Sequence, residues 1–153
     1  MGSAERSARL RAMSLLQKRR YSEKQLEDKL KESGYSQDVI QDALSYVKSF
    51  RYVDDLQLAI DYITYHEADK SKRRLIMDLN RKGISADVIS QAFEQWQALG
   101  GQQDEQEIIR KLLEKKHYDP GCDLKEKQRI YAFLLRKGFS VDNVNSVLRV
   151  YEM

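Results

Sequence analysis

The side chains best suited to chemistry in this sequence are basic residues gathered in a few stretches. Clustered Lys and Arg attract phosphate and carboxylate groups, so we expect an anionic partner, either a nucleic-acid backbone or an acidic protein groove. The net charge of +3 is small although 33% of the residues are charged, which indicates a mixed surface with local basic clusters. The candidate binding residues are Lys72, Arg73, Arg74, Arg81, Lys82, Lys115, Lys116, Arg129, Arg136 and Lys137.

Part of this charge also has a structural interpretation. Arg81-Lys82 and Arg136-Lys137 lie in the last turns of expected helices, where cations stabilise the helix dipole. These two pairs therefore fit either helix stabilisation or binding. The residues from Lys72 to Arg74 instead open an expected helix, where positive charge is unfavourable. Because the sequence shows no compensation for them, we interpret them as part of a functional surface.

No group of residues has the spacing of a catalytic or metal site. His66 and His117 lie in polar segments at helix ends, and neither has a His or Cys neighbour at ligand spacing. Asp54 and Asp55 are adjacent acids, but Asp54 is better explained as a helix cap than as half of an acid–base pair. We therefore expect a protein that is not an enzyme and that holds no metal or cofactor.

The composition favours a cytoplasmic protein. No apolar run approaches the roughly 18 residues of a membrane-spanning helix. The N-terminal residues lack the continuous apolar core of a signal peptide. Cys122 is the single cysteine, so no disulfide forms within the chain.

A helix–glycine–helix corner, found three times, must position the charged side chains. Its copies run from Leu30 to Ile40, from Leu79 to Ile89 and from Leu134 to Val144, with the glycine in fifth place. A glycine in this place adopts the left-handed conformation that ends a helix, and the Ser two residues later caps the next helix. The apolar residue between them is expected to contact both helices. The corner residues are Gly34, Ser36, Gly83, Ser85, Gly138 and Ser140.

These glycines recur about 50 residues apart, which predicts an array of helical repeats. Between the corners, Ser22, Asp54, Asp104 and Asp123 each stand three residues before Gln or Glu, a pattern typical of helix starts. No segment alternates as a strand does, so the predicted class is all-α, with three groups of three helices at residues 1–53, 54–101 and 102–153. In the first helix, Leu10, Met13 and Leu16 are expected to face the core, with Ala12 as a further candidate. In the helix that Asp104 starts, the residues expected inside are Ile108, Ile109, Leu112 and Leu113.

Three motifs, in order along nearly the whole chain, resemble the RecX family of bacterial recombination regulators. They are Ser22-Glu23-Lys24-Gln25-Leu26 leading to Leu30, then Tyr52-Val53-Asp54-Asp55 followed by Ala59, and Leu79 with Lys82-Gly83-Ile84, answered by Leu135 to Ser140. Arg51 and Ser71 depart from the family pattern, which usually has Gly at both places. These departures bear on local turn geometry and on the basic linker before the fifth helix.

The resemblance implies three tandem three-helix repeats in an elongated, curved molecule. It also implies a regulator that binds the RecA–DNA filament and inhibits its ATPase, strand-exchange and co-protease activities in recombination and DNA repair. We expect a monomer. The residues leave an alternative open, a helical module that binds single- or double-stranded DNA directly. Leu30, Leu79 and Leu134 argue against it, because a helix-turn-helix usually has a small residue four before its turn glycine.

Overall fold

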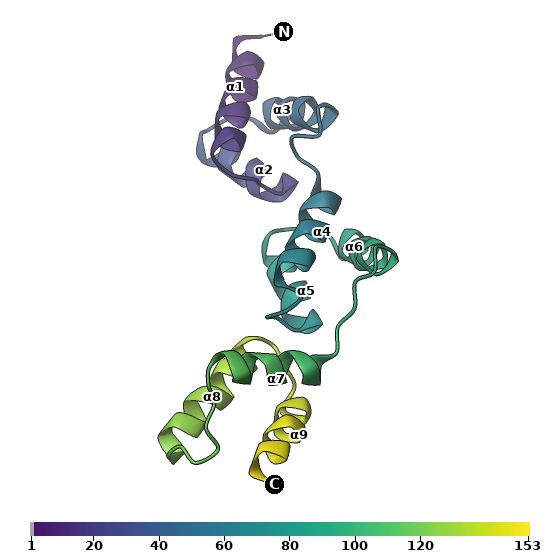
Figure 1. Ribbon diagram of the computed structural model, residues 1–153. Helices are drawn as coiled ribbons and strands as arrows, with labels where there is room; N and C mark the ends of the chain where they lie inside the picture. The colour runs from purple at the N-terminus through teal and green to yellow at the C-terminus, as the bar shows by residue number, and fades with distance from the viewer. Residues whose placement is uncertain (1) are drawn as a thin grey trace. The chain divides into compact units, whose positions relative to one another are not determined.

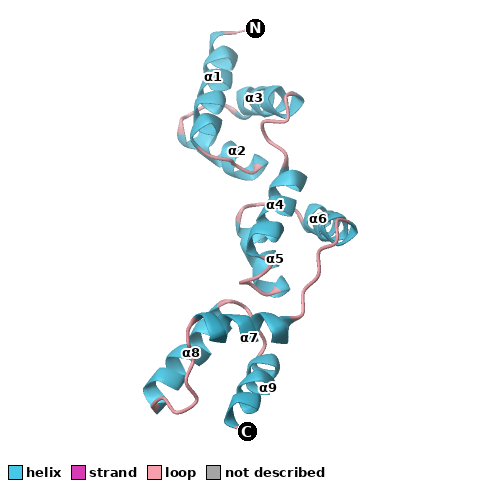
Figure 2. Ribbon diagram, in the orientation of Figure 1, coloured by secondary structure: helices cyan, strands magenta, loops and turns pink. Residues whose placement is uncertain are grey.

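A computed structural model describes residues 2–153, and all the regular secondary structure in this range is α-helical (Figure 1). Figure 2 shows helices and loops and no strand over this range. None of these helices combines the length and the apolar character needed to cross a membrane. The predicted all-α class is therefore confirmed. The helices are α1 (Ser3–Lys18), α2 (Glu23–Glu32), α3 (Gln37–Ser49), α4 (Asp55–His66), α5 (Lys72–Arg81), α6 (Ala86–Ala98), α7 (Glu105–Lys115), α8 (Leu124–Arg136) and α9 (Val141–Glu152).

Side-chain caps start the helices where the sequence predicts them. Ser22 begins α2 with a complete capping box, in which its hydroxyl accepts from Gln25 N at 3.1 Å and its own N–H donates to the Gln25 side chain. An aspartate carboxylate caps α4, α7 and α8 in the same place, with distances of 2.9–3.3 Å to the backbone N–H three residues on. Each cap satisfies a backbone donor that the first helical turn leaves without a partner. These aspartates are Asp54, Asp104 and Asp123.

All three glycine corners have the predicted left-handed geometry. The φ angles are +89° at Gly34, +83° at Gly83 and +94° at Gly138. In each corner the residue after the glycine donates its N–H to the carbonyl of the Leu five residues earlier, which closes the helix end. The bonds are Tyr35 to Leu30 at 3.4 Å, Ile84 to Leu79 at 3.2 Å and Phe139 to Leu134 at 3.3 Å.

The chain divides into two compact units. Unit 1 comprises the residues up to Asp61 together with Leu79–Gln95, and unit 2 comprises Tyr62–Asp78 together with Trp96–Met153. Helices α4, α5 and α6 each contribute residues to both units. The predicted boundaries after residues 53 and 101 stay predictions.

In unit 1, α1 packs against α2 and α3, and one expectation about α1 is wrong. Leu10 is 66% exposed, whereas Ala8, Ala12 and Leu15 are buried. Ala12 is thus buried as expected and Leu10 is not, while Met13 and Leu16 are partly buried at the edge of this face. The small Ala side chains allow α1 to approach its neighbours closely, a preference that a search for large apolar residues overlooks.

In unit 2, α7, α8 and α9 enclose a core that matches the predicted pattern. The four apolar residues expected to face inward on α7, which are Ile108, Ile109, Leu112 and Leu113, are all buried. They pack with Ile130 and Leu134 of α8 and with Phe139, the corner residue. This core holds the C-terminal ends of α7 and α8, which carry many of the candidate binding residues.

Candidate partner-binding surface

The start of α5 is in contact with the corner between α8 and α9. Ser71 is fully buried and caps α5, accepting a hydrogen bond from Arg74 N at 3.0 Å. Its own N–H donates to the carbonyl of Lys137 at 3.0 Å, and the Arg74 guanidinium donates to the carbonyl of Arg136, also at 3.0 Å. Two carbonyls at the end of α8 thus find partners at the start of α5. We call this contact the α5 joint, defined by Ser71, Arg74, Arg136, Lys137 and Gly138.

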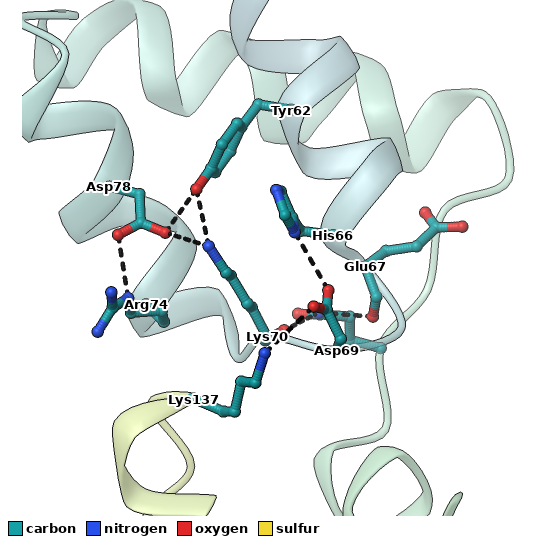
Figure 3. Close-up of polar contacts among 9 residues, drawn as sticks. Tyr62, His66, Glu67, Asp69, Lys70, Arg74, Asp78 and Lys137 are labelled. Atoms are coloured by element: carbon teal, nitrogen blue, oxygen red, sulfur yellow. Dashed lines mark hydrogen bonds and ion pairs between the residues drawn. The ribbon is translucent and has the colours of Figure 1, made fainter. Parts of the chain in front are cut away.

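Asp78, one turn after Arg74, neutralises the basic charge at the joint. Its buried carboxylate accepts from Lys70 Nζ at 2.8 Å, from Arg74 Nε at 3.0 Å and from the Tyr62 hydroxyl at 2.6 Å (Figure 3). Burial acts to raise the pKa of Asp78. The hydrogen bonds from Lys70 and Tyr62 and the charges of Lys70 and Arg74 outweigh it, so the pKa lies below its ordinary value. The carboxylate is therefore the charged centre of a satisfied network.

The interpretation of the α5 N-terminus as uncompensated charge is wrong for Arg74. Its guanidinium has a carboxylate partner and a backbone carbonyl, both within unit 2, so the fold accounts for its charge. The i, i+4 spacing of Arg74 and Asp78 on one helix indicates such an ion pair, but we did not use it as a prediction. Lys72 and Arg73 lie exposed on the same turn, and Arg73 has no charged partner among the described residues.

A second basic feature is a groove of about 400 Å³ between α7, α8 and the loop after α4. We call it the lysine groove. Lys116 Nζ lies 4.1 Å from the centre of the Phe133 ring, and Lys137 Nζ lies 5.6 Å from it. Lys137 Nζ also lies 3.5 Å from Asp69 Oδ2. Figure 3 marks this contact with a dashed line. The groove is lined by Asp69, Leu112, Lys115, Lys116, Phe133 and Lys137.

The structure brings only some of the predicted binding residues together. Lys115, Lys116 and Lys137 meet at the lysine groove, although they come from the ends of two helices. Arg129 is exposed, does not line the groove and hydrogen-bonds Glu126 at 3.5 Å. Arg136 is exposed and serves the α5 joint through its carbonyl.

The pair Arg81-Lys82 belongs to unit 1 and lies in a similar joint. Arg81 is exposed, and the carbonyl of Lys82 accepts a hydrogen bond from the Ser22 hydroxyl. Gly83 follows directly, and its backbone faces Lys24 of α2. We call this contact the α2 joint, defined by Ser22, Lys24, Lys82 and Gly83.

Sequence reasoning missed three residues of the groove. Leu112 was assigned only to the core, and Asp69 and Phe133 were not singled out. Phe133 stands four residues before Lys137, a spacing that places both on one face of α8. Asp69 is separated from Lys137 by 68 residues, so no local pattern connects them.

Asp54, Asp55 and His66, considered above for catalysis or metal binding, have partners within the fold. Asp54 caps α4, while Asp55 accepts from Glu23 N at 2.9 Å at the start of α2. Burial raises the pKa of Asp55 above its ordinary value. His66 Nδ1 lies 3.2 Å from Asp69 Oδ1. Across residues 2–153, no three His, Cys, Asp or Glu side chains form a group that would hold a metal ion.

Comparison with known proteins gives one consistent family. The family models described as the first and the third three-helix domain of RecX match residues 8–46 and 103–148. The regulatory protein RecX of Mycobacterium sp. strain KMS is 32% identical over 151 residues, which cover 95% of this chain and 82% of that protein. The regulatory protein RecX of Caldanaerobacter subterraneus subsp. tengcongensis is 30% identical over 146 residues, which cover 95% of this chain and 71% of that protein. The crystal structure of RecX from Lactobacillus salivarius has the same fold, with a TM-score of 0.67 at 21% identity over 99% of both chains. The motifs at the helix starts and corners, the all-α fold and these matches lead to one conclusion, that the chain belongs to the RecX family.

Proposed function

We propose that the protein is a regulator without enzymatic activity that binds the RecA–DNA filament in the cytoplasm. It inhibits the filament's ATPase, strand-exchange and co-protease activities. The observation that carries this proposal is the similarity to proteins named regulatory protein RecX, which extends over 95% of the chain. The adjacent acids considered for catalysis, Asp54 and Asp55, accept hydrogen bonds from backbone N–H groups at the starts of α4 and α2, so the fold already uses them.

The exposed cations of unit 2 are the surface that we assign to the filament. Lys115 and Lys116 have no carboxylate partner among the described residues, and neither does Arg73. Such cations gain more from an anionic partner than Arg74 does, because Arg74 already has one. Lys137 belongs to the same surface through the groove, although it also contacts Asp69.

The proposal is tested by adding the protein to RecA filaments preformed on single-stranded DNA with ATP, at fixed salt. We expect ATP hydrolysis to fall as the protein is added, and we expect the protein alone to hydrolyse no ATP. Binding to the same DNA without RecA is measured in parallel over a range of salt, because binding to phosphates weakens steeply as salt rises. Unchanged ATP turnover at protein concentrations that saturate naked DNA would contradict the regulator and favour a direct DNA-binding module.

A further inference from the structure

The lysine groove combines a positive edge with an apolar lining. Two ammonium groups, those of Lys116 and Lys137, lie over or near the ring of Phe133, and Lys115 adds a third. The aliphatic stems of the lysines extend the apolar surface that Phe133 and Leu112 begin. An occupant that matches this lining combines negative charge with an apolar group.

The groove already contains one carboxylate, which belongs to Asp69. It lies 3.5 Å from Lys137 Nζ and also contacts His66 Nδ1 at 3.2 Å. Lys137 and Asp69 are both partly exposed, with side-chain exposures of 29% and 37%, so their ion pair is weak and open to exchange. A carboxylate that enters the groove can therefore displace Asp69 from Lys137.

The shape and chemistry of the groove favour a peptide over a nucleic acid. The ammonium groups of Lys115, Lys116 and Lys137 suit carboxylates as well as phosphates. A phosphate backbone needs cations along an extended track, whereas these lysines surround one depression of about 400 Å³. A volume of this order suits one large apolar side chain and the charged residues beside it.

We propose that the lysine groove binds an acidic peptide segment of a partner protein, with one apolar side chain against Phe133 and Leu112. In this arrangement Asp69 competes with the peptide's carboxylates for Lys137. The inference deepens the proposed function and rests on it, since it names the chemistry of the partner segment that this surface takes. The binding itself is measurable with the full chain alone.

The test is a titration of the protein into a short fluorescein-labelled peptide of glutamates flanking one leucine, followed by fluorescence anisotropy. The double variant Lys115→Gln with Lys116→Gln should bind about tenfold more weakly, because two unpaired cations are lost. The matched control is Lys18→Gln with Lys125→Gln, which changes the net charge equally at exposed sites outside the groove. This control should retain the affinity of the unchanged protein.

Asp69→Asn is the most informative variant, because it separates competition from simple support of the fold. It removes the internal carboxylate while keeping the size of the side chain, so the peptide should bind about threefold more tightly. A merely structural Asp69 would give equal or weaker binding, and that result would overturn the competition. A peptide with serine in place of leucine should bind more weakly than the parent, and equal affinity would overturn the apolar contact.

The outcomes also distinguish this inference from the proposed function. If the protein suppresses ATP hydrolysis by RecA filaments but the acidic peptide does not bind, the inference fails and the regulator stands. If the peptide binds in the groove but the filament is unaffected, the regulator fails and the groove serves another partner. Binding of a labelled single-stranded oligonucleotide that is lost with Lys115 and Lys116, without peptide binding, would assign the groove to nucleic acid instead.

Discussion

The two joints solve one packing problem with different chemical groups. In unit 1 the glycine corner before α6 rests on the start of α2, and in unit 2 the corner before α9 rests on the start of α5. Both use the serine that caps the supporting helix and the carbonyl of the lysine before the glycine. At the α2 joint the Ser22 hydroxyl makes the bond, whereas at the α5 joint the backbone N–H of Ser71 does.

The charge around the two joints also differs. Asp78 near the α5 joint has two cations and a hydroxyl as partners, and its pKa is lowered. Asp55 near the α2 joint is paired mainly with a backbone N–H, and burial raises its pKa. The acid near the α2 joint therefore binds a backbone group, whereas the acid near the α5 joint binds charged side chains. Cations that look alike in the sequence can consequently be paired within the fold or remain exposed on the surface.

The largest expected effect comes from filling the space above the corner glycines. A Cβ at Gly138 would lie 2.2 Å from Ser71 Oγ and 2.5 Å from Arg74 Cβ, and one at Gly83 would lie 2.4 Å from Lys24 Cβ. Gly138→Ala and Gly83→Ala should therefore each lower the free energy of unfolding by about 2–4 kcal/mol, through left-handed strain and the clash together. Chemical denaturation followed by circular dichroism measures this loss.

The first corner provides the matched control for this prediction. A Cβ at Gly34 would meet nothing within 4 Å, although its φ of +89° is as strained for Ala as those of the other two. Gly34→Ala should therefore cost only about 1–2 kcal/mol. Equal losses for all three substitutions would show that the joints add nothing to the cost of the glycine conformation.

Asp78→Asn should have the next largest effect, because Lys70 and Arg74 lose the charge of their common partner. We expect a loss of about 2 kcal/mol at neutral pH. The folded-state pKa of Asp78 is lowered, so its contribution to stability is present above the unfolded pKa of about 3.9 and is lost as pH falls through the lower folded value. The difference between the protein and the variant should accordingly shrink below about pH 4.

Asp55→Asn sharpens the comparison, because the expected pH dependence has the opposite sign. A raised folded-state pKa means that stability falls as pH rises from the unfolded pKa through the folded one. The amide oxygen of Asn still accepts from Glu23 N, so this variant should be nearly neutral or slightly stabilising above that range. Denaturation midpoints across acidic and neutral pH measure both variants. Parallel pH profiles for Asp55→Asn and Asp78→Asn would contradict the assignment.

The serine caps give a smaller difference between the joints. Ser22→Ala removes both the capping bond from Gln25 N and the bond to the Lys82 carbonyl, so it should cost about 2 kcal/mol. Ser71→Ala removes only the cap, because its backbone N–H still bonds Lys137, and should cost about 1 kcal/mol. A larger loss for Ser71→Ala would reverse the chemical roles assigned to the two serines.

Local patterns made most of the fold predictable. The capping box at Ser22, the aspartate caps and the left-handed glycines depend on residues within a few positions of one another, so the sequence reveals them. The prediction for the buried face of α1 was wrong at Leu10, which is exposed, and it left out Ala8 and Leu15, which are buried. Apolar size is a poor guide where helices approach closely.

The candidate surface was only partly predictable, because it depends on pairs distant in the chain. Arg74 reaches the carbonyl of Arg136, 62 residues away, and this contact converts a candidate binding residue into part of a joint. The assembly of Lys115, Lys116 and Lys137 around Phe133 likewise requires α7 and α8 to be packed together. Charge in the sequence indicated an anionic partner, but only packing separates exposed cations from those already paired.

The most direct test of the account compares two variants in the suppression of RecA filament ATPase. One is the double variant Lys115→Ala plus Lys116→Ala, and the other is Arg74→Ala. The lysine variant should keep its stability within about 0.5 kcal/mol, because exposed charges contribute little, yet it should suppress ATP hydrolysis much less than the unchanged protein. Arg74→Ala should lose about 1–2 kcal/mol of stability, but it should suppress hydrolysis normally under conditions in which it is folded. Normal suppression by the lysine variant, together with loss of suppression by folded Arg74→Ala, would contradict the account.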